Sequence, residues 1–306
     1  MNKIKTVISG IFYPLAMLSY FVRAFERRDD IELSTVGPFS GDYIPWANGM
    51  RLPMRYVKTP TISLPSEMVG KNIHPMLVER QLGFEPDLWI QIDAGFRFSD
   101  RPKAKVVAHI QTDPHVLKEF YKLPQSYSDV NFCMQKVYAS PNDIYLPYAF
   151  DPTVHYPMDL PKEYDGILIG LQYEQRTKLI NELRRRGYSI RYDIGLVYDE
   201  FREEYNKSRV ALNWSSMDDL NARSFEAFGM RLPLLTNRVS DITNFFVEGV
   251  HYLGFSNLEE AVAQFIRLIN DPELRNYLSV NAERTALGGH TYDDRVQQIL
   301  KVCQLV

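Results

Sequence analysis

The first forty residues contain two apolar runs separated by a longer segment of mixed character. The run at residues 4–9 predicts a strand, and the segment from Pro14 to about Arg28 predicts a helix, because proline is favoured in a first helical turn. The apolar run at 31–36 predicts a second strand. A strand, a helix and a strand in this order are the repeating unit of a parallel α/β sheet, which we therefore expect.

Three more strands are predicted in the first half of the chain. They are short, rich in residues that fill a sheet core, and cover 87–92, 105–110 and 130–134. Asp93 follows one of these strands, and His109, Asp113 and His115 lie around the end of the next. Ligands of parallel sheets bind at the carboxyl ends of the strands, so these side chains are candidates for a functional site.

A proline-containing segment at 145–155 interrupts both the helix and the strand patterns and predicts a linker. After it, residues 166–170 predict a strand that ends in glycine, and residues 177–186 predict a helix. A length of 306 residues is enough for two domains that each bury a core. We therefore predict an α/β fold with two Rossmann-like domains, at 1–150 and 151–306.

The last fifty residues show helical periodicity. Apolar residues of 259–270 recur at the spacing of a helix packed on one side, and the Asp271-Pro272 pair marks a break before the next helix. The final helix repeats the pattern, with apolar positions from Val296 to Val302. These stripes are typical of core packing.

Composition and charge narrow the class of protein. The chain is 45% hydrophobic and 24% charged, which is typical of a folded soluble protein. Its net charge of -3 gives no global attraction to nucleic acid or to anionic membranes. Two cysteines, Cys133 and Cys303, are too few for a disulfide framework and favour a reducing, cytoplasmic location.

The N-terminal residues imitate a targeting segment. Lys3 and Lys5 precede an apolar stretch from Val7 to Val22, as in a signal peptide. Pro14 interrupts this stretch, which is shorter than the roughly 20 residues of a membrane-spanning helix. We therefore expect no stable membrane insertion.

The segment 221–236 carries the most specific chemistry of the chain. Asp219 or Asn221 is placed to cap a short helix, whose free N–H groups and positive dipole end attract anions. Arg223 adds a full positive charge in the first turn, and Glu226 follows on the same helical face. A phosphate suits the arginine, and the two hydroxyls of a ribose suit the carboxylate. The alternative is a surface helix with an ordinary ion pair.

The C-terminal half resembles a known family of enzymes. The resembling stretches, in matching order and spacing, are 205–213, 221–236, 271–275 and 290–295. They are similar to the C-terminal domain of the two-lobed GT-B glycosyltransferases, and most closely to the CgeB-like branch. The resemblance implies a cleft between two lobes, with the acceptor on the N-terminal side and the nucleotide sugar on the C-terminal side. It also implies that the last helix crosses back to the first domain.

The resemblance assigns a donor-binding set. Glu226 matches the second of two acidic residues that stand eight positions apart in the family, and Asp218 occupies the first position. Gly170 and Arg176 match a loop where glycine lets the backbone approach the ligand and arginine reaches the leaving phosphate. Asn213, at the end of a resembling stretch, completes the set with Arg223. Two departures from the family pattern are Asp218 itself and Arg231, which stands where glycine is usual.

The chemistry of sugar transfer predicts how these residues act. The enzyme must stabilise the charge that grows on the departing diphosphate, by a metal ion or by basic groups. The chain has no Asp-x-Asp motif, and its adjacent aspartates at 29–30, 218–219 and 293–294 make poor metal clamps. We therefore predict a metal-independent reaction, with the nucleotide sugar as co-substrate and no other cofactor. Arg176 and Arg223 are assigned to the diphosphate and Glu226 to the ribose.

Asp113, with His109 or His115, is assigned to the sugar or the acceptor. Asp113 is either a general base or a ligand of a sugar hydroxyl, and this choice decides between inverting and retaining chemistry. The acceptor is a glycan, a lipid, a small molecule or a modified base in DNA.

Three alternatives to the leading function stay open. A DNA acceptor draws on Arg51, Arg55 and Lys58, and on the mixed cationic and aromatic segment 96–105. A non-catalytic nucleotide-sugar binding protein and a sugar-nucleotide epimerase are also compatible with this fold.

Overall fold

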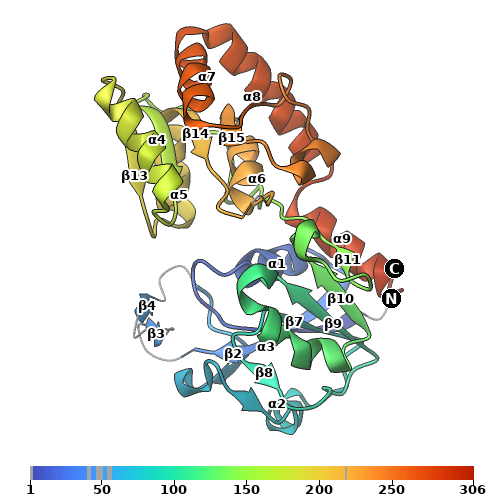
Figure 1. Cartoon of the computed structure of the whole chain (residues 1–306). Helices are drawn as coiled ribbons and strands as arrows, with labels where there is room; N and C mark the ends of the chain where they lie inside the picture. The colour runs from blue at the N-terminus through green and yellow to red at the C-terminus, as the bar shows by residue number, and fades with distance from the viewer. Residues whose placement is uncertain (1–2, 40–42, 46–50, 54–56, 218) are drawn as a thin grey trace. The chain divides into compact units, whose positions relative to one another are not determined.

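The chain forms two compact units in the computed structural model, which describes residues 3–39, 43–45, 51–53, 57–217 and 219–306. Unit 1 comprises Met1–Pro147 and Tyr292–Val306, and unit 2 comprises Tyr148–Thr291 (Figure 1). We predicted a border at residue 150 and a last helix that returns to the first domain. In the structure the chain enters unit 2 at Tyr148 and returns to unit 1 at Tyr292.

Unit 1 contains a sheet of seven parallel strands among its described residues. In spatial order they are β11 (Ile144–Tyr145), β10 (Val130–Cys133), β9 (Val106–Gln111), β7 (Leu88–Ile92), β1 (Ile4–Ser9), β2 (Ile31–Pro38) and β5 (Ile62–Leu64). The chain adds strands first on one side of β1 and then on the other. The order in which strands are added therefore reverses between β1 and β7. Ligands of parallel sheets bind beyond the carboxyl ends of the strands at such a point.

Short elements and helices complete unit 1. They are α1 (Leu18–Glu26), α2 (Met76–Leu82), α3 (Pro114–Tyr127), α9 (Tyr292–Val302), the 3-10 turns η2 (Ser66–Met68) and η3 (Lys136–Tyr138), and the strand pairs β3 (Tyr43–Pro45) with β4 (Arg51–Pro53) and β6 (Asn72–Ile73) with β8 (Arg97–Phe98). The predicted first helix starts at Leu18 and not at Pro14, because residues 14–17 form a turn in which Ala16 N donates to Tyr13 O. In the described part of the chain, none of the helices has the length and apolar character needed to cross a bilayer.

The last helix belongs to the core of unit 1. The Tyr292 ring of α9 stacks on Tyr20 of α1 with a centroid distance of 5.2 Å, and its edge meets Phe21 at 5.0 Å. At the surface, Arg27 forms two hydrogen bonds with the Asp293 carboxylate, of 2.8 and 2.9 Å. The aromatic contacts fix the C-terminal segment to the first helix of the chain.

Unit 2 contains a second parallel sheet, of five strands among its described residues. Their spatial order is β13 (Ile190–Asp193), β12 (Tyr164–Ile169), β14 (Ser208–Asn213), β15 (Leu234–Asn237) and β16 (Tyr252–Phe255). The order in which strands are added to this sheet reverses between β12 and β14. The carboxyl ends of these two strands, at Ile169 and Asn213, therefore flank the place where a ligand is expected.

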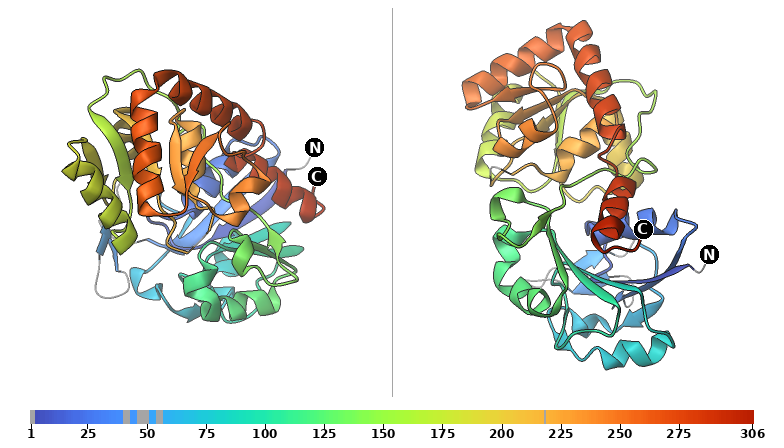
Figure 2. Two further views of the ribbon diagram at one scale, coloured as in Figure 1. Left: turned by 45° about the horizontal axis from the view of Figure 1, so that its top comes forward. Right: turned by 90° about the vertical axis from the view of Figure 1, so that its right-hand side faces the viewer.

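Helices flank the sheet of unit 2 (Figure 2). They are α4 (Glu174–Arg185), α5 (Tyr198–Asn206), α6 (Ala222–Gly229), α7 (Leu258–Asn270) and α8 (Pro272–Leu287), with the 3-10 turn η4 (Ser240–Asn244). Leu179 of α4 and Phe265 of α7 share one core cluster with Leu212 of β14. Right-handed crossovers place α5 and α6 on the other face, and neither helix contributes to that cluster. The predicted α/β fold with two Rossmann-like domains is confirmed.

The predicted break between the last helices of unit 2 is also confirmed. Asn257 caps α7 by accepting a hydrogen bond from Glu260 N at 2.9 Å. Asp271 ends α7 and caps α8, accepting from Leu274 N at 2.8 Å, with Pro272 in the first helical position.

A glycine in β2 permits the close approach of two backbone segments, and this contact predicts a stability effect. A Cβ at Gly37 would lie 2.0 Å from the carbonyl oxygen of Gly10, which cannot move without shifting the sheet. We expect Gly37→Ala to lower the free energy of unfolding by about 1–3 kcal/mol, measured by urea denaturation. Gly289→Ala is the control, since a Cβ there has no neighbour within 4 Å. Equal stability of the two variants would contradict the close approach of the Gly37 backbone to the carbonyl oxygen of Gly10.

Candidate functional site

Gly170 stands directly after β12, at the reversal point of the second sheet. Its φ of +151° is strained for residues with a side chain. A Cβ there would lie 2.3 Å from Nη2 of Arg223 and 3.5 Å from Nη1 of Arg176. Because glycine has no side chain, the two guanidinium groups can lie close to the backbone here. The side chain of any other residue would fill this space.

Arg176 reaches this place from α4 and is held by backbone carbonyls. Its Nε donates to Trp214 O at 2.7 Å, and its Nη1 donates to Leu171 O at 2.9 Å. The guanidinium also lies over the Tyr173 ring, 4.9 Å from the centroid. Only 5% of the residue is exposed. Arg176 is therefore not a solvated charge on the surface of α4.

Arg223 reaches the same place from the first turn of α6. Its Nε donates to Ile169 O at 2.9 Å, and its Nη1 donates to Asn213 Oδ1 at 2.8 Å. Asn213 is buried at the end of β14, and its Nδ2 donates to Thr236 Oγ1 of β15 at 3.0 Å. The ends of three neighbouring strands thus orient one guanidinium. The structure brings together Gly170, Arg176, Asn213 and Arg223, four residues of the predicted donor-binding set.

The charges of Arg176 and Arg223, which we call the arginine pair, are not neutralised by an acid among the residues that the structure describes. Their hydrogen-bond partners are neutral, and no carboxylate of the described chain forms a direct ion pair with either. The Nη2 groups take no part in these bonds. Burial, with a contribution from Arg223, lowers the pKa of Arg176 to about 10. Buried charges in proteins are normally paired, so this arrangement suits an anionic ligand.

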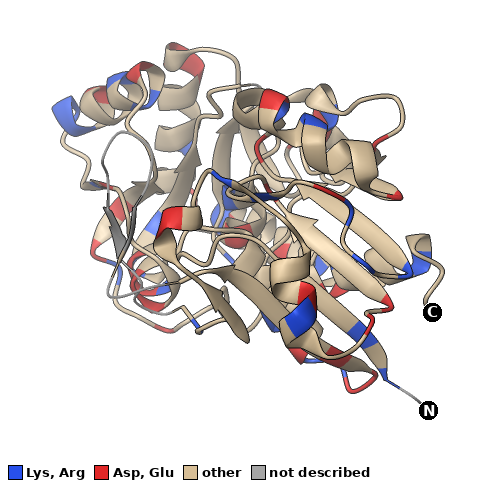
Figure 3. Cartoon of the chain, turned by 90° about the horizontal axis from the view of Figure 1, so that it is seen from below, with Lys and Arg blue, Asp and Glu red and all other residues tan. Residues whose placement is uncertain are grey.

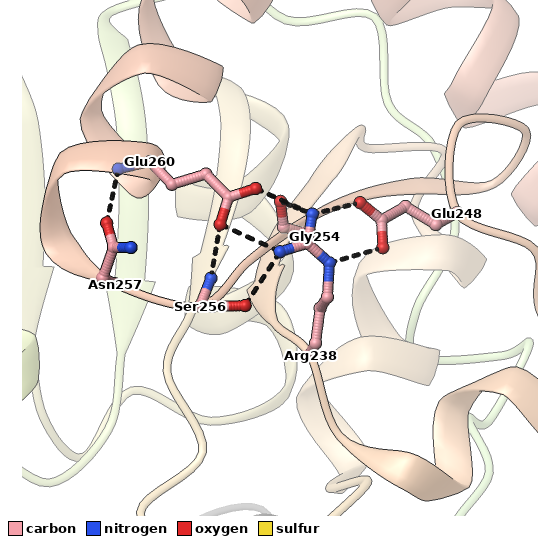
Figure 4. A network of polar contacts seen from close by, with 6 residues as sticks. All are labelled: Arg238, Glu248, Gly254, Ser256, Asn257 and Glu260. Atoms are coloured by element: carbon pink, nitrogen blue, oxygen red, sulfur yellow. Dashed lines mark hydrogen bonds and ion pairs between the residues drawn. The ribbon is translucent and has the colours of Figure 1, made fainter.

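Arg238 shows the opposite case at the ends of β15 and β16 (Figure 4). Its guanidinium forms two hydrogen bonds with Glu248, of 2.9 and 2.7 Å, and two with Glu260, of 2.9 and 2.8 Å. Ser256 Oγ and Gly254 O accept further bonds, and the two carboxylates raise the pKa of Arg238. This fully paired cation stabilises the local loops and has no capacity left for a ligand.

Glu226 lies on α6, one turn after Arg223, and is 13% exposed. Burial raises the pKa of its carboxyl to about 7, although the charge of Arg223 acts in the opposite direction. The buried Tyr205 of α5 faces the same charges, and burial raises the pKa of its hydroxyl to about 12. His155 Nε2 lies 3.8 Å from Glu226 Oε1. The sequence analysis did not identify Tyr205 or His155, because neither belongs to a motif that predicts this contact.

The start of α6 differs in detail from the prediction. Asn221 occupies the N-cap position but makes no capping hydrogen bond, and its Nδ2 donates to Asn213 Oδ1 at 3.3 Å. Asp219 accepts a hydrogen bond from the Ser215 hydroxyl. Asp218, the predicted first acidic residue, lies outside the described residues.

The candidate residues of unit 1 lie near the reversal point of the first sheet. Asp113 is exposed at the N-cap of α3, and its backbone N–H donates to the Tyr121 hydroxyl at 3.1 Å. That hydroxyl donates to Asp93 Oδ1 at 2.6 Å, and Thr112 Oγ1 donates to Asp93 Oδ2 at 2.9 Å. Asp93 has a φ of 64°, which costs energy for a non-glycine residue. Burial raises the pKa of Asp93 above its ordinary value, although the hydrogen bonds from Tyr121 and Thr112 act in the opposite direction.

The two predicted histidines differ in their surroundings. His109 has no exposed surface within β9, both of its ring nitrogens lack a hydrogen-bond partner, and burial lowers its pKa to about 3. The ring therefore stays neutral in the core. His115 is half-buried in the first turn of α3, and its Nδ1 lies 2.8 Å from Gln135 Oε1. Of the two, only His115 is partly exposed.

The segment proposed to contact DNA does not present its aromatic rings. Phe96 and Phe98 have no exposed surface and pack edge to face at 5.4 Å. Arg97 donates to Asn72 Oδ1 at 2.7 Å, Arg101 pairs with Asp129 at 2.6 Å, and Lys105 pairs with Asp87 at 2.6 Å. Figure 3 shows basic and acidic residues interspersed along the ribbon. The expected alternation of free cations and stacking rings is therefore wrong for this segment.

The structure describes the side chain of only one of the other basic residues considered for DNA. Lys58 pairs with Glu26 at 2.6 Å, Arg51 lies in β4, and Arg55 lies outside the described residues. In the part of the chain that the structure describes, no three His, Cys, Asp or Glu side chains gather closely enough to hold a metal ion.

Comparisons with known proteins agree with this architecture. Residues 158–301 match the family model described as glycosyl transferase-like. No curated protein sequence matches the chain. The fold is similar to that of HepE from Anabaena in complex with UDP-glucose, with a TM-score of 0.63, 10% identity, and coverage of 99% of this chain and 100% of the other.

Two further solved structures share the fold over the whole chain. An alpha-glucosyltransferase in complex with UDP and a 13-mer DNA containing a HMU base has a TM-score of 0.65, 11% identity, and coverage of 99% and 100%. A putative UDP-N-acetylglucosamine 2-epimerase from Listeria monocytogenes has a TM-score of 0.59, 12% identity, and coverage of 99% and 96%. Identities this low show the fold alone.

The match of residues 158–301 confirms the predicted resemblance of the C-terminal half to glycosyltransferases, and the shared fold confirms two domains of the GT-B type. The matched domain covers most of unit 2, and thus includes the arginine pair and Glu226. The closer relation to the CgeB-like branch stays a prediction.

The raised pKa of Glu226 predicts a pH-dependent stability in the absence of ligand. The folded pKa of about 7 lies above the ordinary value of 4.5, so the folded state retains a proton that the unfolded state loses. The free energy of unfolding should therefore fall as the pH rises between these values. Glu226→Gln should match the wild type near pH 5 and exceed its stability by about 2 kcal/mol near pH 8, in urea denaturation. A constant difference across this range would contradict the burial of an ionising carboxyl.

Proposed function

We propose that this glycosyltransferase-type chain transfers a sugar from a nucleotide-sugar donor to an acceptor hydroxyl, and that unit 2 binds the donor. The observation that carries the proposal is the arginine pair, two cations held at Gly170 without a neutralising acid. A diphosphate supplies the missing negative charge. The fold is shared with proteins solved in complex with UDP-glucose and with UDP.

The proposed roles follow from the donors that the arginine pair leaves unused. The Nη2 groups of Arg176 and Arg223 bind the diphosphate, together with backbone N–H groups at the start of α6. As the bond to the sugar breaks, negative charge grows on the diphosphate, and fixed cations in a poorly solvated place stabilise it. Glu226, in its ionised form, accepts hydrogen bonds from the ribose hydroxyls.

The reaction is proposed to need no metal ion. The arginine pair and the helix start provide the positive potential that a divalent cation supplies in other transferases. The nucleotide sugar is the only co-substrate in this scheme.

The acceptor is proposed to bind at unit 1, at the carboxyl ends of β7 and β9. Asp113 is exposed there, and its backbone is held by the Tyr121 hydroxyl. Asp113 serves as the general base or as a ligand of a sugar hydroxyl, and His115 follows it in the first turn of α3. Glycans, lipids and small molecules are favoured as acceptors over DNA, because the buried rings of Phe96 and Phe98 offer no stacking surface.

We also propose a cytoplasmic location. Cys133 and Cys303 are both free and buried, and burial raises the pKa of each thiol to about 11. Free thiols are typical of reducing compartments.

The arginine pair predicts the effect of removing one cation. Arg176→Gln should weaken UDP binding by about 10–100-fold, because a hydrogen bond from a cation to a phosphate is lost. Isothermal titration calorimetry measures the affinity, and GDP and ADP are titrated in parallel. Lys178→Gln on the same helix is the matched control, since Lys178 is exposed and pairs with Glu174. Wild-type affinity of the Arg176 variant, with its melting temperature retained, would refute the assignment.

A second prediction concerns the metal ion and the reaction class. With a panel of nucleotide sugars, slow hydrolysis of a donor is expected at the same rate with and without EDTA. Loss of activity in EDTA, restored by Mg²⁺ or Mn²⁺, would contradict the metal-independent scheme. Isomerised donor would identify an epimerase, and binding without turnover a non-catalytic protein.

A further inference from the structure

A buried histidine lies beside the carboxylate proposed to bind the ribose. The His155 side chain is 1% exposed, and its Nε2 lies 3.8 Å from Oε1 of Glu226. His155 precedes β12, whereas Glu226 lies on α6. Two nearly buried polar side chains from distant parts of the sequence therefore meet within unit 2.

The turn at residues 151–155 fixes the position of this histidine. The Asp151 carboxylate accepts hydrogen bonds from Thr153 N at 2.9 Å and from Thr153 Oγ1 at 2.8 Å. His155 N donates to Asp151 O at 2.8 Å. Asp151 has no exposed surface. The turn is thus held by its own hydrogen bonds and presents the imidazole in one orientation.

The same turn selects the tautomer of the ring. Asp151 N donates to His155 Nδ1 at 3.3 Å, so Nδ1 acts as an acceptor and carries no hydrogen. The neutral ring then has its hydrogen on Nε2, the nitrogen that faces Glu226. The ring edge also meets Phe201 of α5 at 5.9 Å. His155 therefore directs a neutral N–H donor toward a carboxylate in a place with little water. The separation of 3.8 Å is longer than a hydrogen bond, so the contact in this structure is electrostatic.

Glu226 needs such a donor for the role proposed above. An ionised carboxylate accepts hydrogen bonds from two ribose hydroxyls, whereas a protonated one gives up an acceptor position. Burial favours the protonated form. The groups that face Glu226 are Arg223 from α6, which favours ionisation, Tyr205 from α5, and His155 from the turn before β12.

We propose that His155 is a positioning residue for donor binding, which uses its Nε2–H to hold the Glu226 carboxylate ionised and oriented toward the ribose. The inference rests on the proposed function, because it assumes that Glu226 binds the ribose. It adds a consequence: His155 affects ligands that contain a ribose and leaves a bare diphosphate unaffected. The turn that ends the connection between the units is then part of the donor site.

Two substitutions separate the two nitrogens of the ring. In His155→Gln, the amide nitrogen reaches the position of Nε2, so the donor toward Glu226 is kept and the acceptor for Asp151 N is lost. In the shorter His155→Asn, the amide oxygen reaches the position of Nδ1, so the acceptor for Asp151 N is kept and the donor toward Glu226 is lost. The matched pair therefore separates the contact with the carboxylate from the contact with the turn.

Binding of UDP and of inorganic pyrophosphate is measured by calorimetry for the wild type and both variants. His155→Asn should weaken UDP binding about tenfold, and His155→Gln should stay within about twofold of the wild type. Pyrophosphate affinity should be the same for all three proteins. In the Glu226→Gln background, the difference between the two variants should disappear, as expected for coupled residues.

A second readout needs no nucleotide. The ionisation of Glu226 is followed by NMR titration of its side-chain carboxyl carbon, identified by its absence in Glu226→Gln. His155→Asn should move the midpoint above that of the wild type, and His155→Gln should leave it in place. A purely structural role of the imidazole would produce the opposite pattern, because only His155→Asn keeps the acceptor for Asp151 N that holds the turn.

Several results would overturn the inference. They are wild-type UDP affinity in His155→Asn, an equal loss of UDP and pyrophosphate binding, or an unchanged midpoint of Glu226. If neither UDP nor pyrophosphate binds the wild type, the donor-site proposal fails. The carboxyl titration then shows separately whether His155 acts on Glu226, and an unchanged midpoint overturns that action as well.

Discussion

The second half of the molecule is organised around positive charge that no carboxylate of the described residues neutralises by a direct ion pair. Arg176 and Arg223 donate to backbone carbonyls and to one amide oxygen, and Gly170 leaves open the space beside them. Holding two cations side by side in a poorly solvated place is unfavourable without an anion. A fold that maintains this arrangement has stability to gain from a diphosphate, and a ligand that binds only the folded state provides it.

The topology of the sheet makes this arrangement achievable. The reversal between β12 and β14 leaves a place at the carboxyl ends where the loop after one strand, the end of the next and the start of α6 converge. Short-range contacts then align the polar groups, as when Thr236 of β15 holds Asn213, which in turn holds Arg223. Arg238, only a strand away, is neutralised by two glutamates, so unpaired arginine is not a general property of this edge.

Much of this could be predicted from the sequence, because the signals are local. Apolar runs predicted strands β1, β2, β7, β9, β10 and β12, and the cap-arginine-glutamate pattern predicted the start of α6. Contacts between distant segments were not predictable. His155 meets Glu226 only after the chain folds, and the core environments of His109 and Phe98 follow from sheet packing that a strand pattern does not specify. The predicted helix start at Pro14 was wrong, because a proline is compatible with a turn as well as with a first helical position, and the helix begins at Leu18.

The most direct measurement of the central claim is a crystal structure of the protein with UDP. The account predicts the diphosphate within hydrogen-bond distance of the Nη2 groups of Arg176 and Arg223, and the ribose hydroxyls on Glu226. UDP bound at another surface, with the space beside Gly170 left without an anion, would contradict it.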